Sequence, residues 1–322
     1  RRNWYFEEGS RKIMKPLHLV PDDVNVPFLK FRKIFYIVSL VMVLASVGLF
    51  VTKGLNFGID FRGGILLEIK TDGPADIGAL RDNLGSLGLG DVSIQEFGEP
   101  DDVLIQLQRQ DGDEKAQMAA LATVTEALGD NVTIRRSELV GPKVGDELKE
   151  AGVYSVAISL LLIMVYIWFR FEWQFAVASV VALLHDVLIT IGFFVITGVQ
   201  FDLATLAAVL TVAGYSINDT VVVFDRIREY LRKFRKMEIP DLLDLSINST
   251  LSRTTMTSFT TLLALIALFV FGGEAIRGFT MALIFGIVIG TYSSICVASP
   301  LLMVLRLNRK IPEGEETQKA GA

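Results

Sequence analysis

The sequence predicts a polytopic α-helical membrane protein with six transmembrane helices and a ferredoxin-like α+β domain inserted between helices 1 and 2. Three observations support this fold class. The chain has 322 residues, and 51% of them are hydrophobic, which exceeds the share in ordinary soluble domains. Six apolar runs approach the roughly 20 helical residues needed to cross a hydrocarbon core about 30 Å thick. The long polar stretch between the first two runs has instead the mixed pattern of strands and helices.

The six predicted spans share long uncharged cores. They are Ile34–Thr52, Val153–Phe169, Phe175–Val199, Leu203–Phe224, Arg253–Gly272 and Thr280–Leu305. The chain then divides into a cytoplasmic N-terminal segment (1–33), helix 1 (34–52), the inserted domain (53–152), helices 2–6 (153–307) and a cytoplasmic tail (308–322).

Basic residues are distributed unevenly between the loops. They gather before the first span, after the fourth span and at the start of the tail, whereas the short connections Gly198–Asp202 and Phe271–Gly278 hold only Arg277. Cytoplasmic loops carry the excess of Lys and Arg, so both termini are expected in the cytoplasm. The inserted domain then lies on the opposite, periplasmic side.

Within the insert the predicted elements follow the order β-α-β-β-α-β, which is the ferredoxin-like signature. They are Ile65–Lys70, Pro74–Leu87, Asp91–Phe97, Asp102–Arg109, Asp113–Leu128 and Asn131–Glu138. The insert is acidic, so it should repel nucleic acid. It contains neither His nor Cys, and this favours a docking or binding module over an enzyme domain.

Metal and disulfide chemistry are not expected. The chain has one cysteine, Cys296, and two histidines that lie far apart, His18 and His185. A single cysteine excludes an intrachain disulfide, a Cys-based metal site and c-type haem attachment. We therefore expect no cofactor.

Asn218 and Asp219 close the fourth apolar run while still at membrane depth. Asp219 lies sixteen residues after Leu203, about 24 Å along a helix that rises ~1.5 Å per residue. A carboxylate in hydrocarbon costs ~2.5–3.5 kcal/mol, so it indicates a functional site. The alternative is that the two side chains only join neighbouring helices by hydrogen bonds.

Arg253 begins the fifth predicted span and lies within a hydroxyl-rich stretch. Their depth, close to that of Asp219, predicts a polar path shared by spans four and five. Arg253 is equally compatible with an ordinary basic flank. In the third span Asp186, next to His185, predicts either an extension of a proton relay or a structural hydrogen-bonded pair. Gly286 and Gly290, with Ser294 continuing their row in the sixth span, predict close helix packing.

Four motifs resemble the SecF family, bacterial protein-export membrane proteins of the SecD/SecF family in the resistance-nodulation-division superfamily. They are Phe57–Gly64, Leu184–Val187, Gly214–Glu229 and Asn248–Thr254. Their order and spacing match the family over about residues 34 to 307. No family motif is found in residues 1–31 or after Leu307.

The resemblance implies a location in the bacterial inner membrane and an accessory role in export. The chain would pair with SecD, associate with the SecYEG channel alongside YajC and YidC, and use the ion-motive force to help move preproteins late in translocation. Asp219 and Arg253 match the family's intramembrane charges implicated in proton flow. Phe57, Gly58, Asp60, Phe61, Gly63 and Gly64 match the segment that joins span one to the outer domain.

Other functions are possible from the residues. Asp186 and Asp219 are the two acids that an intramembrane aspartyl protease would need, but such acids share one site, and the estimated depths differ. Small-molecule efflux is disfavoured by the single modest outer domain. A scaffold that only stabilises the channel, without transducing energy, remains open. The coupling ion could be H⁺ or Na⁺, because a carboxylate among hydroxyls suits either.

Overall fold

The computed structural model describes residue 21 and residues 24–307, except residues 91, 113, 130, 274 and 275. Most of the predicted N-terminal segment (1–33) and the predicted tail (308–322) lie outside the described residues. So do Asp91 and Asp113, with which a strand and a helix were predicted to begin.

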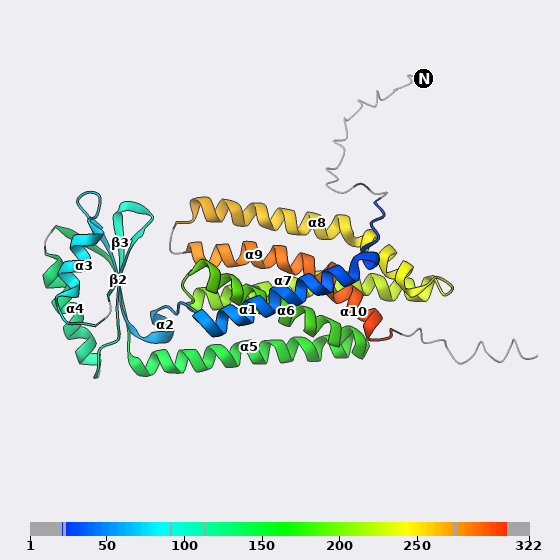
Figure 1. Cartoon of the computed structure of the whole chain (residues 1–322), viewed down its shortest axis with the longest axis horizontal. Helices are drawn as coiled ribbons and strands as arrows, with labels where there is room; N and C mark the ends of the chain where they lie inside the picture. Colours follow the sequence, from blue (N-terminus) through cyan, green and yellow to red (C-terminus); the bar gives the residue numbers. More distant parts are fainter. Residues whose placement is uncertain are drawn as a thin grey trace, which may run out of the picture.

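Six helices in the described part of the chain are long and apolar enough to cross a membrane. Five are α1 (Arg32–Lys53), α5 (Pro142–Arg170), α6 (Trp173–Thr197), α7 (Leu203–Lys233) and α8 (Ile239–Phe271). The sixth is built from α9 (Arg277–Ser293), a π-helical turn η3 (Ser294–Ala298) and α10 (Ser299–Val304). A short 3-10 helix, η1 (Phe28–Phe31), precedes α1. Figure 1 shows the bundle at one end of an elongated molecule and the sheet at the other.

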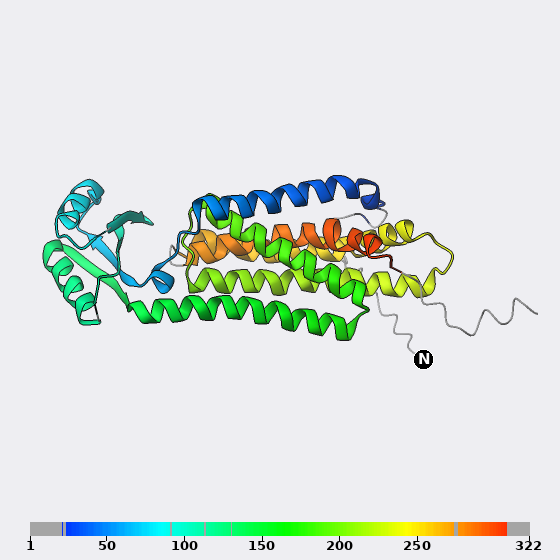
Figure 2. The same cartoon turned by 60° about the horizontal axis from the view of Figure 1, so that its bottom comes forward.

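The bundle has an inner and an outer set of helices. Helices α6, α7 and α9 are the most buried, whereas α1, α5 and α8 expose most of their apolar side chains. Figure 2 shows α1 and α5 on opposite sides of the bundle. Apolar side chains on the outside suit contact with lipid, so polar groups on the inner helices face protein.

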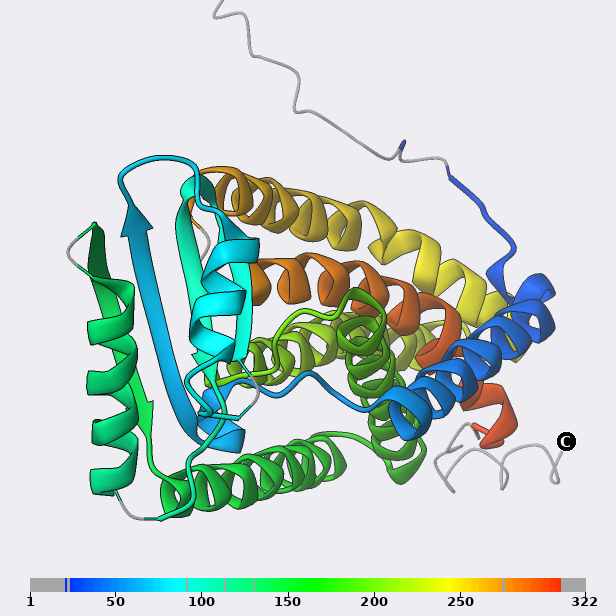
Figure 3. The same cartoon turned by 60° about the vertical axis from the view of Figure 1, so that its left-hand side comes forward.

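The inserted domain has a four-stranded antiparallel sheet in the order β2-β3-β1-β4. Its elements are β1 (Gly64–Thr71), α3 (Ile77–Gly85), β2 (Val92–Phe97), β3 (Glu99–Leu107), α4 (Glu114–Leu128) and β4 (Val132–Val140). Alternate residues such as Ile65, Leu67 and Ile105 are buried beneath α3 and α4. The opposite face is turned toward the bundle (Figure 3). The order of elements in the insert is the predicted one. The short helix α2 (Ile59–Arg62) was not predicted.

Two helices begin earlier than the apolar runs indicated. Helix α5 begins at Pro142 rather than Val153, and α8 begins at Ile239 rather than Arg253. In α8 the polar first part is still helical because Leu242, Leu243 and Ile247 are buried in the core of the bundle, while hydroxyls such as that of Ser246 bond to carbonyl oxygens of the preceding turn. Hydropathy finds the part of a helix that lies in lipid, not its polar extension.

The residues before α1 are attached to α8. The Asn248 side chain accepts a hydrogen bond from the backbone N–H of Val26 and donates one to its carbonyl, each 2.9 Å long. Asp244 accepts from the backbone N–H of Leu29 at 2.9 Å. These bonds join the beginnings of α1 and α8 at the end of the bundle away from the sheet.

Candidate functional site

Asp186 lies at the centre of a buried polar cluster. It belongs to α6 and is 0% exposed. Its Oδ2 accepts hydrogen bonds from Ser216 of α7 and, at 2.6 Å, from Ser293 of α9. Its Oδ1 lies 2.8 Å from Nδ1 of His185, a distance at which an N–H donates to a carboxylate. Donors from three helices thus offset the cost of burying this group.

The polar cluster continues from His185 toward α1. The His185 ring stacks on Tyr292 with 6.1 Å between centroids. The Tyr292 hydroxyl in turn lies 3.0 Å from Ser39 Oγ. His185 and Tyr292 contact each other by stacking and not by a hydrogen bond. The chain of hydrogen bonds from Asp186 toward Ser39 is therefore interrupted between these two rings. Nε2 of His185 is buried and has no hydrogen-bond partner among the described residues.

Asp219 lies one helical turn after Ser216 on α7. Its side chain is buried, with 2% exposure, and its Oδ2 has no hydrogen-bond partner in the described part of the structure. Leaving a buried carboxylate oxygen unpaired is costly. Asp219 is therefore a group that a proton or a small cation would stabilise.

The predicted meeting of Asp219 with Arg253 is not an ion pair in this structure. Among the described residues, no nitrogen of Arg253 lies within 4.0 Å of the Asp219 carboxylate. Arg253 is exposed on α8, whereas Asp219 faces the interior. The two opposite charges still attract each other without direct contact. Asn218 is also exposed and lies on the outer side of α7.

Hydroxyl groups from three helices surround the region near Asp219. Ser258 of α8 lies 2.7 Å from the hydroxyl of Thr291 in α9 and accepts from Tyr215 of α7 at 3.4 Å. Thr220 of α7 lies 3.0 Å from Ser294 in η3. The structure therefore includes α9 as well as the two predicted helices in the polar region.

Gly286 and Gly290 allow α9 to approach α7 closely. A Cβ added to Gly286 would overlap the Val212 side chain, and one added to Gly290 would lie 3.1 Å from Ser216 Cβ. The close approach brings Ser293, one turn after Gly290, within reach of Asp186. The two glycines thus help to form the Asp186 cluster.

The segment from Phe57 to Gly64 fastens the inserted domain to α7. The N–H of Gly58 donates to the carbonyl of Phe201 at 2.9 Å, and Asp60 Oδ2 accepts from the N–H of Leu203, the first residue of α7, at 2.9 Å. The ring of Phe61 stacks on Phe201, with 5.8 Å between centroids. Asp202 also caps α7 by accepting from the Thr205 N–H. This segment, residues Phe57–Gly64, is called the junction below. It contacts the start of α7 directly.

Gly63 and Gly64 are required by the geometry at the end of this segment. Both have positive φ, 72° and 126°, which side chains other than glycine rarely adopt. A Cβ on Gly64 would also collide with the carbonyl oxygen of Leu107 in β3. Only glycine fits where the segment turns into β1.

Ser293, Tyr292 and Ser39 belong to the polar cluster but were not singled out by the sequence. The row of small residues four apart, Gly286, Gly290 and Ser294, was visible, yet it indicated packing. Their exact partners depend on how each helix is rotated, and an apolar helix gives no periodic signal for that rotation.

Comparison with known proteins gives consistent matches. Residues 120–308 match the family described as protein export membrane protein SecD/SecF, C-terminal, and residues 48–75 match the SecD/SecF GG motif. The chain is 44% identical to protein translocase subunit SecF of Rickettsia rickettsii, over 92% of this chain and 98% of that protein. For SecF of Vibrio alginolyticus the identity is 44%, over 93% of this chain and 96% of that protein.

Two solved structures of SecDF are similar. One is SecDF from Thermus thermophilus, described as a translocon-associated membrane protein, with a TM-score of 0.80 and 36% identity over 90% of this chain. The other, SecDF in a super-membrane-facing form, has a TM-score of 0.67 and 35% identity over 95% of this chain. The chain covers 40% and 41% of those two longer chains.

Proposed function

Because the chain belongs to the SecD/SecF family of protein-export membrane proteins, we propose that it is a translocase subunit that couples an ion-motive force to late preprotein translocation and release. It would act with SecD and the SecYEG channel, with YajC and YidC as further partners. We place it in the bacterial inner membrane with both termini in the cytoplasm. The ferredoxin-like domain would then lie on the periplasmic side. No chemical catalysis is expected.

The observation that carries the proposal is the position of α7. This one helix holds Asp219, donates from Ser216 to the Asp186 carboxylate, and is joined at its first residue to Asp60 of the junction. A change in charge at Asp219 alters how α7 packs, because a buried neutral carboxyl group has a much smaller desolvation cost than a carboxylate. Any resulting movement of α7 reaches the outer domain through Asp60.

The available energy is adequate for such a cycle. Moving one elementary charge across about 100 mV supplies ~2.3 kcal/mol. That energy shifts a two-state population by roughly fiftyfold, since about 1.4 kcal/mol corresponds to tenfold. The coupling ion is H⁺ or Na⁺, and both would bind at the unpartnered oxygen of Asp219.

Asp186 and Asp219, the two acids that an aspartyl protease would need, do not lie in one site. Asp186 is occupied by Ser216, Ser293 and His185. No described contact joins it to Asp219. An aspartyl protease needs two carboxyl groups close enough to share a proton, so this arrangement favours transport over proteolysis.

The test is an export assay in inverted membrane vesicles with proton and sodium gradients imposed separately. We expect Asp219→Asn to abolish the gradient-dependent part of export and to leave ATP-driven export and assembly with SecD intact. Asp225→Asn is the matched control, because Asp225 lies on the same helix but is exposed and paired with Arg170 at 3.6 Å. Full gradient-dependent export by Asp219→Asn would favour a scaffold that does not transduce energy.

A further inference from the structure

The hydroxyl group of Thr254 in α8 is buried and has no hydrogen-bond partner among the described residues. Thr254 as a whole is only 2% exposed. A threonine within a helix usually donates its hydroxyl proton to a carbonyl of the preceding turn, as Thr250 and Thr261 do on the same helix. Because an unpaired polar group in the interior is costly, the Thr254 hydroxyl needs a partner from outside its own helix.

Thr254 lies at the same depth in the bundle as Asp219. Helices α7 and α8 pack against each other and run in opposite directions, since only residues 234–238 join the end of one to the start of the other. The hydroxyls of Tyr215 and Ser258 mark one level of contact, at 3.4 Å. Asp219 lies four residues after Tyr215, and Thr254 lies four residues before Ser258. One turn along each helix therefore leads from this contact to Asp219 and Thr254, on facing sides of the two helices.

Two unpaired oxygen atoms thus share one level between α7 and α8. They are Oδ2 of Asp219 and Oγ1 of Thr254, and neither has a hydrogen bond in the part of the chain that the structure describes. One turn further out, the hydroxyls of Ser258 and Thr291 bond to each other at 2.7 Å. The level of Asp219 therefore differs from its surroundings, because its oxygens can both accept a ligand.

Arg253 is the positive charge that acts on the Asp219 carboxylate within the described residues. It attracts the carboxylate without contacting it, so it offsets part of the charge and supplies no hydrogen bond. Titratable groups on α6 and α9 bond elsewhere: His185 with Asp186, and Tyr292 with Ser39. The two unpaired oxygens therefore still need a ligand that they can share.

We propose that Thr254 is a second ligand of the coupling ion, and that its hydroxyl oxygen shares the bound ion with Oδ2 of Asp219. The inference rests on the proposed function and deepens it, because it names a residue that decides how tightly the ion is held. A protonated Asp219 would donate its O–H to the Thr254 oxygen. A sodium ion would instead take both oxygens in place of part of its hydration shell. In both cases the hydroxyl accepts, so its loss weakens the binding of either ion.

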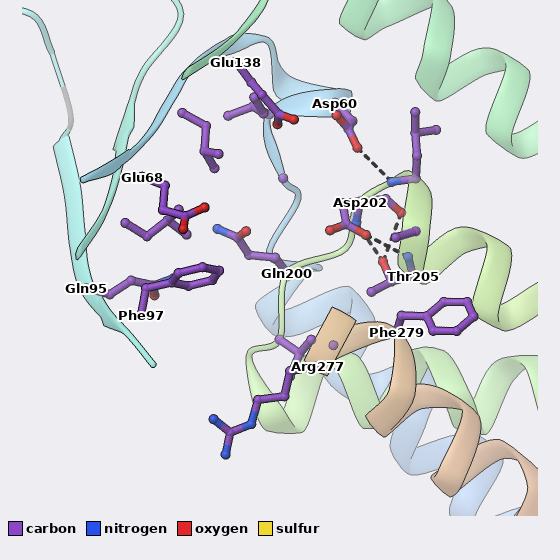
Figure 4. Close-up of a pocket in the computed structure, with 18 of the residues that line it drawn as sticks. Asp60, Glu68, Gln95, Phe97, Glu138, Gln200, Asp202, Thr205, Arg277 and Phe279 are labelled. Atoms are coloured by element: carbon purple, nitrogen blue, oxygen red, sulfur yellow. Dashed lines mark hydrogen bonds between the residues drawn. The ribbon is translucent and has the colours of Figure 1, made fainter. Parts of the chain in front are cut away.

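Ion binding at this level would hold α7 and α8 together. Figure 4 shows the outer end of α7, where Asp60 and Asp202 bond to the first turn of the helix. Asp219 lies sixteen residues after Leu203, the first residue of α7. A shared ion between Asp219 and Thr254 therefore acts on a helix whose other end is attached to the junction.

Carbodiimide labelling measures ion binding at Asp219 without export. Dicyclohexylcarbodiimide reacts with the protonated form of a carboxyl group in apolar surroundings. Mass spectrometry of the full chain in zwitterionic nanodiscs then gives the labelled fraction of Asp219. A pH series tests the proton, because labelling rises as protons bind. A sodium series at fixed pH tests Na⁺, because a bound cation prevents labelling.

Thr254→Val removes the hydroxyl and keeps the shape of the side chain. We expect half-maximal labelling, or half-maximal protection by sodium, to require about tenfold more of the ion, because one hydrogen bond or ligand is lost. Thr254→Ser keeps the oxygen and should stay within about twofold of the unchanged protein.

Thr250→Val is the matched control. Thr250 is also buried on α8, but its hydroxyl donates within its own helix, so this substitution should shift neither series. Unchanged ion dependence in Thr254→Val, or an equal shift in Thr250→Val, would overturn the proposal. A tenfold shift in Thr254→Ser, about as large as that in Thr254→Val, would also overturn it, since the hydroxyl would then not be the group that matters.

Export in inverted vesicles keeps the two proposals separate. Thr254→Val should regain gradient-dependent export when the driving ion is raised about tenfold, whereas Asp219→Asn should not. A fully active Asp219→Asn protein, together with shifted labelling in Thr254→Val, refutes the coupling alone. An inactive Asp219→Asn protein, together with unshifted labelling in Thr254→Val, refutes the role of Thr254 alone.

Discussion

Replacing Asp60 by alanine should loosen the start of α7 and weaken coupling without unfolding either domain. Asp60 Oδ2 accepts from the Leu203 N–H at 2.9 Å, one of the donors that a helix leaves unpaired at its N-terminus. The loss of such a cap costs ~1 kcal/mol, and the loss of a negative charge beside the helix dipole adds ~0.5 kcal/mol. Asp202 still caps Thr205, so the helix persists.

Hydrogen exchange of the Leu203 amide measures the loosening of the start of α7 directly. A loss of about 1.5 kcal/mol corresponds to roughly tenfold faster exchange of the Leu203 amide in the Asp60→Ala protein. Asp60→Asn keeps an acceptor and should show a smaller effect. In vesicles, Asp60→Ala should reduce gradient-dependent export and leave ATP-driven export unchanged.

The matched control is Asp76→Ala. Asp76 caps α3 by the same kind of bond, 2.9 Å from the Ala79 N–H, but it lies in the outer domain away from the junction. It should cost similar stability and leave export unchanged. Normal export by Asp60→Ala despite faster exchange at Leu203 would refute the view that the junction transmits movement of α7. Unchanged exchange would refute the capping argument itself.

Two further predictions concern stability. Gly286→Leu should lower the melting temperature in detergent, because its side-chain atoms would overlap Val212 and overpacking costs ~1–3 kcal/mol. The control is Gly214→Ala, which should not lower the melting temperature, because no atom lies within 4 Å of the added Cβ. In the outer domain, a hydrogen bond from Lys70 lowers the pKa of Asp101 below its ordinary value. Stability from this pair is present above the unfolded pKa of about 3.9 and is lost as pH falls through the lower folded value. Denaturant titrations from pH 6 to pH 2 should therefore show a weaker acid dependence in Lys70→Met, and an identical dependence would contradict the assignment.

The membrane helices were predictable because each depends on a local property, the length of an uncharged run. The same holds for the order of strands and helices in the insert, where the alternation of Val103, Ile105 and Leu107 marks a face that the structure buries. Helix ends were less accessible. The start of α8 at Ile239 is stabilised by the packing of Leu242, Leu243 and Ile247 in the core of the bundle, which the hydropathy of the polar stretch around them does not record.

The partners of the predicted site residues were not predictable. The sequence indicated that Asp186 and Asp219 were unusual, but not that Ser293 would bond the first and that the second would keep an unpaired oxygen. These outcomes depend on helix rotation and on the close approach allowed by Gly286. Arg253 illustrates the same limit, since it is exposed on α8 while Asp219 is buried.

The attachment of residues 26–29 to α8 restricts how the bundle can open. Asn248 and Asp244 form hydrogen bonds with the backbone on both sides of Pro27, so the ends of α1 and α8 that lie away from the sheet are held together. Separation of these helices is then greatest at the far end, beside the sheet. A rocking motion pivoted at Asn248 would convert small rearrangements in the membrane into larger displacements of the outer domain.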